Sequence, residues 1–374
     1  MNLRAAYAGK RVFVTGHTGF KGSWLTLWLS ELGAEVTGYS LAPNTEPALF
    51  SVLGLSSRCR DLTADVRDFD KLRTAIREAR PHVIFHLAAQ PLVRESYEHP
   101  LETIQTNVMG TAHLLEAIRV EELSCAVVIV TSDKCYENRE SLHGYREDDA
   151  MGGHDIYSMS KGATELLVSS YRRSFFGSLQ AESGGVRLAS ARAGNVIGGG
   201  DWAKDRIIPD IVRAIAKRIP VVVRNPMSVR PWQHVLEPLS GYLLLGSRLQ
   251  SADSSVSAQA CEGWNFGPNL DAARPVKDLV SGLIEGFGEG SWEDGRDKAA
   301  PHEANLLRLS IEKAHVHLGW RPRWDFATTL AHTVDWYKAH RAGATTESMI
   351  GLSLSQITDY GAPSHRASSS TADA

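Results

Sequence analysis

The sequence lacks several features that would point to particular classes of protein. Its 374 residues contain four cysteines, none in Cys-x-x-Cys spacing: Cys59, Cys125, Cys135 and Cys261. This distribution is typical of reduced thiols and argues against a disulfide framework or a cysteine-based zinc site. His315 and His317 form a His-x-His pair without a third ligand nearby in the sequence, so we predict no structural metal.

The net charge is small, and long apolar runs are absent from the sequence. The formal net charge is -3 at pH 7, so we expect no nucleic-acid partner. No segment reaches the roughly 18 consecutive apolar residues of a membrane-spanning helix, and the first residues show no apolar region typical of a signal peptide. We therefore expect a cytoplasmic protein with no membrane partner.

Short apolar runs alternate with helical patterns through the first half of the chain. The runs predict strands at residues 11–15, 35–39, 82–87, 126–131 and 186–192. Amphipathic stretches between them predict helices at residues 23–32, 71–80 and 103–118. Repeated βαβ units with apolar strands indicate an α/β fold, namely a Rossmann-type doubly wound parallel sheet.

The second half is less regular, with helices expected at residues 205–217, 238–249 and 276–286. We expect residues 1–190 to form the Rossmann domain and residues 191–345 a smaller, interleaved substrate-binding lobe. Residues 346–374 end in small polar side chains and are expected to be a flexible tail.

A glycine-rich turn, Gly16-x-x-Gly19-x-x-Gly22, follows the first predicted strand and opens the first predicted helix. Such a turn lets backbone amides approach a pyrophosphate at a helix N-terminus, so we predict a dinucleotide site that includes His17 and Phe20. The spacing differs from Gly-x-Gly-x-x-Gly and lacks the ending of a nucleoside-triphosphatase loop. A chance cluster of glycines is the alternative.

Further candidate cofactor contacts lie where later strands end. Asp65 and Val66 follow a strand-like run at residues 59–62, and the fourth strand leads into four residues of the expected crevice: Leu87, Ala88, Ala89 and Gln90. The second strand ends in Gly38-Tyr39-Ser40, without the acidic residue that usually binds the ribose 2′-hydroxyl. The choice between NAD and NADP therefore stays open on these residues alone.

Tyr157 and Lys161 lie four residues apart and share one helical face. Tyrosine has a reference pKa of about 10, so it needs a nearby cation to act as a base at neutral pH. Ser132 and Asp133 end the 126–131 run and should enter the same crevice, where Asp133 could act as a general acid. Lys134 could be a base only with a depressed pKa. The alternative for these two residues is a structural role, in which Asp133 caps the following turn and Lys134 is solvated.

These motifs, together with Asn107, resemble the extended short-chain dehydrogenase/reductase superfamily and its nucleotide-sugar enzymes over about residues 9–340. Blocks such as TGHTGFKGSWL, TSDKCYEN and ARAGNVIGGGDWAKDRIIPD resemble its CDP-glucose dehydratase branch. The resemblance implies bound NAD, with Asn107 among the residues of the cofactor site. It also implies a CDP-glucose substrate.

The resemblance further implies a redox cycle on the sugar. Tyr157 would take the 4-hydroxyl proton while hydride passes from C4 to NAD⁺, and Lys161 would hold the ribose and lower the tyrosine pKa. Asp133 would help water leave across C5 and C6 before hydride returns to C6. Lys134 stands where the dTDP-glucose branch carries the glutamate that removes the C5 proton, so the C5 base stays open.

Substrate contacts are expected from the second half. Asn195 resembles the residue that contacts the substrate phosphate, while Arg206, Arg230 and Arg274 could bind the diphosphate through their planar guanidinium groups. His234 is a weaker candidate. A surface salt bridge is the alternative for each arginine.

The resemblance implies a homodimer through a bundle of helices 103–118 and 155–170, or a tetramer. Alternative functions are a nucleotide-sugar 4-epimerase, another nucleotide-sugar dehydratase, and a non-catalytic dinucleotide-binding regulator.

Overall fold

The computed structural model describes residues 2–177, 185–269, 272–295 and 306–362. Its centre is a parallel seven-stranded sheet in the order β11-β6-β5-β4-β1-β2-β3. The strands are β1 Arg11–Thr15, β2 Glu35–Ser40, β3 Arg60–Thr63, β4 Val83–His86, β5 Ala126–Val130, β6 Arg187–Ala193 and β11 Gly263–Phe266. After β1, the next two strands lie on one side of it, and the strands from β4 onward lie on its other side. In open α/β sheets, ligands bind where the strand order reverses in this way, here between β1 and β4.

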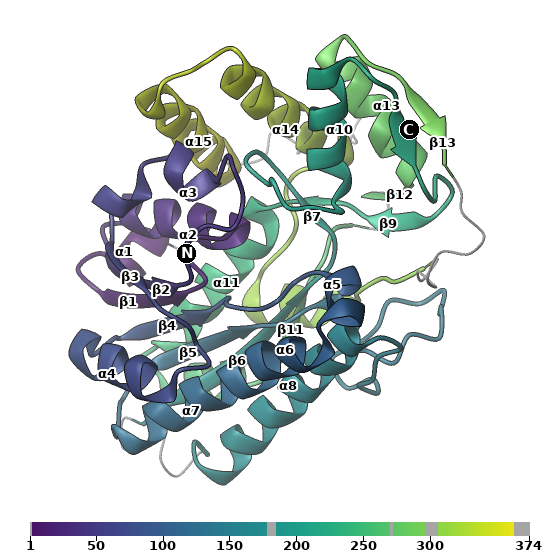
Figure 1. Cartoon of the computed structure of the whole chain (residues 1–374). Coiled ribbons are helices and arrows are strands. Elements are labelled where there is room, and N and C mark those ends of the chain that lie inside the picture. Colours follow the sequence, from purple (N-terminus) through teal and green to yellow (C-terminus); the bar gives the residue numbers. More distant parts are fainter. Residues whose placement is uncertain (1, 178–184, 270–271, 296–305, 363–374) are drawn as a thin grey trace, which may run out of the picture.

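Helices cover both faces of the sheet (Figure 1), which confirms the predicted doubly wound α/β fold. One face carries α2 Phe20–Glu31 and α11 Leu236–Leu249; the other carries α4 Phe69–Ala79, α7 Gly110–Val120 and α8 Ile156–Ser174. Alternate residues of β1 point to opposite layers: Val12 and Val14 join the α2 and α11 core, and Phe13 joins the α4, α7 and α8 core.

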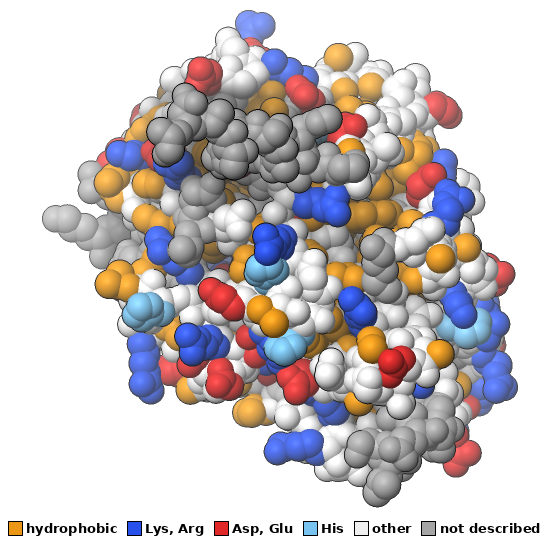
Figure 2. Space-filling model, turned by 180° about the vertical axis from the view of Figure 1, so that it is seen from behind, with side chains coloured by type: hydrophobic (Ala, Val, Ile, Leu, Met, Phe, Trp, Pro, Cys, Tyr) orange, Lys and Arg blue, Asp and Glu red, His pale blue; other side chains and the backbone are white. Residues whose placement is uncertain are grey.

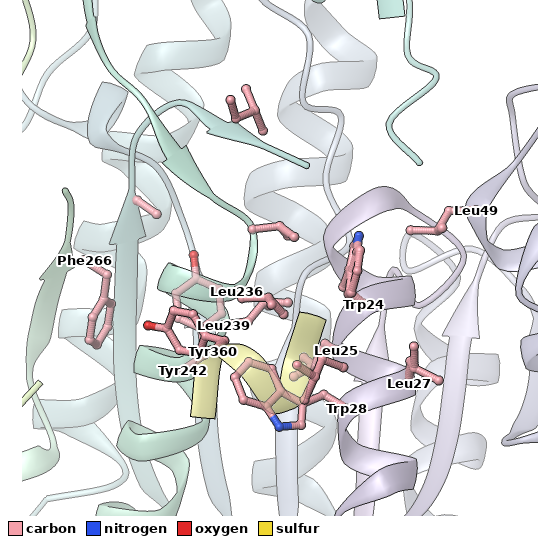
Figure 3. Close-up of a cluster of buried hydrophobic side chains, with 14 of the residues drawn as sticks. Trp24, Leu25, Leu27, Trp28, Leu49, Leu236, Leu239, Tyr242, Phe266 and Tyr360 are labelled. Carbon is pink, nitrogen blue, oxygen red and sulfur yellow. The ribbon is translucent and has the colours of Figure 1, made fainter. Parts of the chain in front are cut away.

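The first of these cores is dense in large side chains. Figure 3 shows Trp24 and Leu25 of α2 in one cluster with Leu236 and Leu239 of α11. All four are fully buried. The continuous burial of β5 explains why the run at 126–131 is apolar without alternation, as expected for a strand covered on both faces.

The predicted strands agree with the observed ones to within one or two residues. The expected helix at 103–118 is instead three pieces: α6 Pro100–Ile104, a π-helical turn at Gln105–Met109, and α7. Asn107 lies in the π-helical turn, a feature often found at functional sites.

Outside the large sheet, the second half of the chain contains short strands in pairs. These strands are β7 Val196–Ile197, β8 Val221–Val223, β9 Val229–Pro231, β10 Gln233–His234, β12 Ala273–Pro275 and β13 Trp292–Asp294. The remaining helices are α1 Leu3–Tyr7, α3 Leu49–Val52, α5 Val93–Glu98, α10 Ile207–Lys217, α12 Ser254–Ala260, α13 Val276–Phe287 and α14 Phe326–Arg341. Because β11 and α11 come from the second half yet complete the large sheet layer, the two halves of the chain interleave.

A last helix, α15 Thr346–Gly361, corrects the expected flexible tail over residues 346–361. Its buried side chains pack against α2 and α14, and Tyr360 stacks edge-on against Trp28. Residues 363–374 of the expected tail lie outside the described residues.

The described helices include none that is both long and apolar enough to cross a membrane. In that same part of the chain, no three His, Cys, Asp or Glu side chains are grouped to hold a metal ion. Figure 2 shows acidic and basic side chains interspersed over one face, in keeping with the small net charge.

Candidate active site

The glycine turn between β1 and α2 is shaped by close backbone contacts. Gly16 has a φ of +73°, and a Cβ on it would lie 2.7 Å from the backbone nitrogen of Ala88. A Cβ on Gly22 would lie 2.0 Å from the Gly16 carbonyl oxygen. Gly19 is the N-cap of α2 and makes no side-chain cap hydrogen bond to the amides of the first turn. This cradle fits a dinucleotide pyrophosphate.

His17 is fully buried beneath this turn. Its Nε2 lies 2.8 Å from Oδ1 of Asp61, and a Cβ on Gly38 would lie only 2.3 Å from its ring. Burial lowers the pKa of His17, and Asp61 opposes the shift. The ring therefore supports the turn from within the protein. Gly38, in place of the usual ribose carboxylate, makes room for it.

Phe20 begins α2 and is partly buried against the large core. Its ring approaches Gly198 in the glycine-rich loop after β7, where a Cβ would lie 3.4 Å from it. Phe20 therefore joins the glycine turn to the second lobe.

Asp65 and Val66 follow β3. Burial alone would raise the pKa of Asp65, but hydrogen bonds from Arg67, at 2.6 to 2.9 Å, lower it overall. Val66 is buried against Gly110 of α7. The Asp65 carboxylate stays partly exposed at the sheet edge, whereas the Val66 side chain is packed in the core.

Residues 87–90 after β4 are half-buried and run past the turn at Gly16. Asn107 holds this segment because its Oδ1 accepts from the Gln90 amide at 2.8 Å and its Nδ2 donates to the Gln90 carbonyl at 3.1 Å. The same Nδ2 donates to Ser160 of α8 at 2.9 Å. Asn107 thus joins the predicted cofactor segment to the predicted catalytic helix.

The predicted catalytic residues come together as expected. Ser132 precedes a short 3₁₀ turn, Asp133–Cys135, and its Oγ donates to Asp133 Oδ1 at 3.0 Å. Tyr157 and Lys161 face this turn from α8, and Lys134, Ser132 and Asp133 are close enough to Tyr157 to affect its pKa. Ser132, Asp133, Tyr157 and Lys161 are each at most 7% exposed. The arrangement places a phenol, a hydroxyl, a carboxyl and an amine around one crevice.

Asp133 and Lys134 differ in their surroundings. Asp133 is 1% exposed, and its Oδ2 has no hydrogen-bond partner among the described residues. A Cβ on Gly194 would lie 2.9 Å from that oxygen. Lys134 is partly exposed, with its amine 3.7 Å from Asp133 Oδ1. Asp133 is therefore enclosed with one oxygen unpaired, and Lys134 reaches solvent.

Burial shifts the two central groups of the site toward neutrality. It raises the pKa of Tyr157, opposed first by the charge of Lys134. It lowers the pKa of Lys161 to about 8, opposed by Glu165 and Cys135. We expected Lys161 to lower the tyrosine pKa; in the structure burial outweighs the cations, and Lys134 is the main one that opposes it.

Lys21, which the sequence did not identify as a site residue, lies at the same crevice. Burial, together with the nearby charges of Arg206, Lys161 and Lys134, lowers its pKa to about 7, and Asp133 opposes the shift. Its position just before Gly22, at the start of α2, is the sequence signal that could have revealed it.

The expected substrate residues take different positions. Arg206 precedes α10, pairs with Asp201 at 3.0 Å and is close enough to Tyr157 to affect its pKa. Arg230 of β9 and Arg274 of β12 are directly opposite in an antiparallel pair, so their side chains leave the same face. This face is suited to a phosphate group.

Asn195 and His234 differ in exposure. Asn195 follows β6, is half-buried, and its carbonyl accepts from the Gln233 amide at 3.2 Å. His234 is completely buried, with the rings of Trp24 and Trp324 at 6.1 and 4.8 Å. The expected substrate contact of His234 is therefore corrected: the residue packs in an aromatic core.

Comparisons with known proteins agree with this arrangement. The family model described as GDP-mannose 4,6 dehydratase matches residues 13–333. A CDP-glucose 4,6-dehydratase of Salmonella typhimurium is 53% identical over 356 residues, covering 95% of this chain and 97% of the relative. A dTDP-glucose 4,6-dehydratase of Streptomyces antibioticus is 30% identical, covering 69% of this chain and 71% of the relative.

Among solved structures, a dTDP-glucose 4,6-dehydratase of Streptomyces venezuelae with NAD and TYD bound has a TM-score of 0.73 at 24% identity. The match covers 89% of this chain and 98% of the chain in that structure. A UDP-glucose 4-epimerase of Thermotoga maritima has the same TM-score at 20% identity, covering 88% of this chain and 99% of its own. These likenesses establish the fold. The family model and the 53% identical relative show that the chain belongs to the GDP-mannose 4,6 dehydratase family, within the extended short-chain dehydrogenase/reductase superfamily.

Proposed function

We propose that this chain is an NAD-dependent CDP-glucose 4,6-dehydratase, which converts CDP-glucose to CDP-4-keto-6-deoxyglucose and water. The observation that carries the proposal is 53% identity to the Salmonella enzyme over nearly the full length of both chains. Ser132, Asp133, Tyr157 and Lys161 around one crevice supply the groups that this chemistry needs.

The cradle at Gly16, Gly19 and Gly22 would hold the pyrophosphate of NAD, because it brings backbone amides together where a side chain would clash. Asn107 would fix the neighbouring segment at Gln90. When bound, NAD supplies a hydride acceptor and donor. The remaining chemistry belongs to the side chains of the crevice.

Tyr157 would take the proton from the sugar 4-hydroxyl, with Ser132 hydrogen-bonded to both the phenol and the reacting oxygen. Burial raises the pKa of Tyr157, so the cations around it decide how readily it ionises. Lys161, itself buried one helical turn from Tyr157, would orient the reacting groups while it carries its proton.

Asp133 would donate a proton to the leaving 6-hydroxyl. Its buried, unpaired Oδ2 is an acceptor or donor position that no described side chain fills. Lys134 could remove the C5 proton only as a neutral amine, and its amine lies 3.7 Å from the Asp133 carboxylate, so the C5 base is left unassigned.

The second lobe would bind the nucleotide. Arg230 and Arg274, on one face of the β9–β12 ribbon, would bind the diphosphate, with Arg206 and Asn195 between this face and the crevice. Their guanidinium groups can each donate two hydrogen bonds to one phosphate.

We further propose a cytoplasmic homodimer through a bundle formed by the helical segment 103–118 and α8, or a tetramer. Support comes from exposed apolar side chains on α6, the π-helical turn and α8: Leu101 at 72%, Met109 at 46% and Leu166 at 62%. Light scattering after size-exclusion chromatography tests this: a monomeric mass would contradict it.

The function is tested by incubating the purified protein with CDP-glucose and NAD⁺, with dTDP-, GDP- and UDP-sugars in parallel. Loss of one water by mass spectrometry, with the alkali-induced absorbance of a 4-keto-6-deoxy sugar, is expected for CDP-glucose. Product of unchanged mass would indicate an epimerase, dehydration of another nucleotide sugar alone would change the substrate, and no turnover of any of them despite bound NAD would favour a regulator.

A further inference from the structure

We propose that Glu165 is a positioning residue for the reaction: it ties the turn that carries Ser132 and Asp133 to the helix that carries Tyr157 and Lys161. The kinetic part of this inference rests on the proposed function. Glu165 belongs to none of the motifs that identified the site, and it lies behind the crevice on the next turn of α8 after Lys161.

One carboxylate makes three hydrogen bonds to two strands. Oε1 of Glu165 accepts from the hydroxyl of Thr131, the residue just before Ser132. Oε2 accepts from Ser190 at 2.7 Å and from the Arg192 guanidinium at 2.8 Å, both on β6. With its side chain 3% exposed, Glu165 joins α8 to the ends of β5 and β6 in a site shielded from water.

Arg192 extends this connection to the other end of the catalytic turn. Its Nη1 donates to the phenol oxygen of Tyr136 at 2.5 Å, and its guanidinium also lies over the Tyr136 ring. Tyr136 directly follows Cys135 and donates in turn to Asn265 of β11 at 2.8 Å. Glu165 therefore holds one end of the turn directly at Thr131 and the other through Arg192.

Glu165 also supplies the main negative charge that favours protonated Lys161. The other titratable groups that act electrostatically with Lys161 come from α2, β4 and the catalytic turn: Lys21, His86 and Cys135. Of these three, a cationic Lys21 opposes the charge of Lys161, and burial lowers the pKa of His86 to about 3, which leaves it neutral near pH 7. Removing the charge of Glu165 should therefore deprotonate Lys161 at lower pH.

A cavity of about 780 Å³ lies beside Glu165 and offers a specific test. Its lining includes Glu165, Arg192 and Arg172 but none of the candidate catalytic residues. A small carboxylate can therefore reach the position of a deleted Glu165 side chain without entering the crevice.

The first test uses Glu165→Gln, which keeps the size of the side chain and removes its charge. We expect kcat for CDP-glucose to fall roughly 10- to 100-fold, as when groups that orient catalytic ligands are replaced, with KM changed much less. The alkaline limb of the kcat/KM profile should move to lower pH. Thr131→Val, which deletes one hydroxyl from the connection, should lower kcat in the same direction by a smaller factor.

Glu237→Gln is the matched control, because Glu237 is also a buried carboxylate with several donors but lies outside the crevice. It should leave the alkaline limb unchanged. In Glu165→Ala, formate but not chloride at equal ionic strength should raise kcat several-fold. An unchanged kcat and pH profile in Glu165→Gln, or equal effects in Glu237→Gln, would overturn the inference.

Hydrogen exchange provides a measurement that does not depend on the substrate. The backbone amides of residues 131–136 should exchange faster in Glu165→Gln than in the wild type or Glu237→Gln. Equal exchange would refute the anchoring whether or not CDP-glucose is turned over. Failure of the wild type with CDP-glucose, together with faster exchange in Glu165→Gln, would refute the proposed function and support the anchoring.

Discussion

Gly16 faces the backbone of Ala88 at a distance that leaves no room for a side chain: a Cβ would lie 2.7 Å from the Ala88 nitrogen. Gly16→Ala would also place alanine at a φ of +73°, which costs roughly 1–2 kcal/mol for a non-glycine residue. We expect NAD affinity to fall about tenfold or more as the turn shifts away from residues 87–90. Isothermal titration calorimetry with NAD⁺ measures the affinity of the variant and of the wild type.

Gly351→Ala is the matched control for the same change. Gly351 lies on the exposed side of α15, and a Cβ on it would have no other atom within 4 Å. Alanine there should leave NAD affinity unchanged and raise stability by roughly 0.5–1 kcal/mol. Equal NAD affinities for the two variants would contradict the cradle.

Asp133→Asn separates the two halves of the proposed reaction. The change removes the acid while keeping the shape of a side chain that is 1% exposed. Oxidation at C4 should persist and water loss should slow by about 100-fold or more, so NADH should accumulate in a single turnover. Absorbance of NADH after rapid mixing measures it, with the exposed Asp148→Asn as control. Equal slowing of both halves would mean that Asp133 is not the acid.

Tyr157→Phe should slow turnover strongly, because it removes the phenol hydroxyl while keeping the ring. We expect kcat to fall roughly 10²- to 10⁴-fold, the usual contribution of a general base. Tyr171→Phe is the control, since Tyr171 lies on the same helix, half-buried, with its hydroxyl directed to Glu116. Steady-state assays with CDP-glucose compare them; similar rates for the two variants would exclude Tyr157 as the base.

Local patterns in the sequence predicted much of the fold and the catalytic crevice. The strand at residues 11–15 matches β1, because a buried strand between two helical layers reads as an apolar run. Ser132 and Tyr157 could be placed together because strand ends meet at one edge of a parallel sheet, and in the structure the turn after Ser132 packs against the helix that carries Tyr157.

The misses depend on contacts between residues far apart in the chain. Tyr136 and Asn265 are 129 residues apart, so no local pattern reveals the connection from Glu165 through Arg192. His234 looked like a site residue because burial among aromatic rings is not visible from its neighbours in sequence. The buried face of α15 includes the polar side chains of Ser353 and Gln356, which hide its helical periodicity.

Glu237 links α11 to the C-terminal part of the chain and should make stability depend on pH. Its carboxylate accepts from the amides of Arg323 and Trp324 and from the Tyr360 hydroxyl of α15. Burial nevertheless raises its pKa from 4.5 to about 7, so the folded state binds a proton more tightly than the unfolded chain. Stability from this group is therefore fully present below about pH 4.5 and is lost as pH rises to about 7.

The Glu237→Gln variant removes this proton binding while keeping a side chain of similar size. Relative to it, the wild type should lose up to about 3 kcal/mol of unfolding free energy between pH 4.5 and 7, because each unit of pKa shift corresponds to about 1.4 kcal/mol. Urea unfolding of both proteins across this range measures the difference. Glu78→Gln, which changes a half-exposed carboxylate paired with Arg60, should show no such trend. The difference in unfolding free energy between the wild type and Glu237→Gln could instead stay constant with pH. That result would show that Glu237 has the same pKa in the folded and unfolded states.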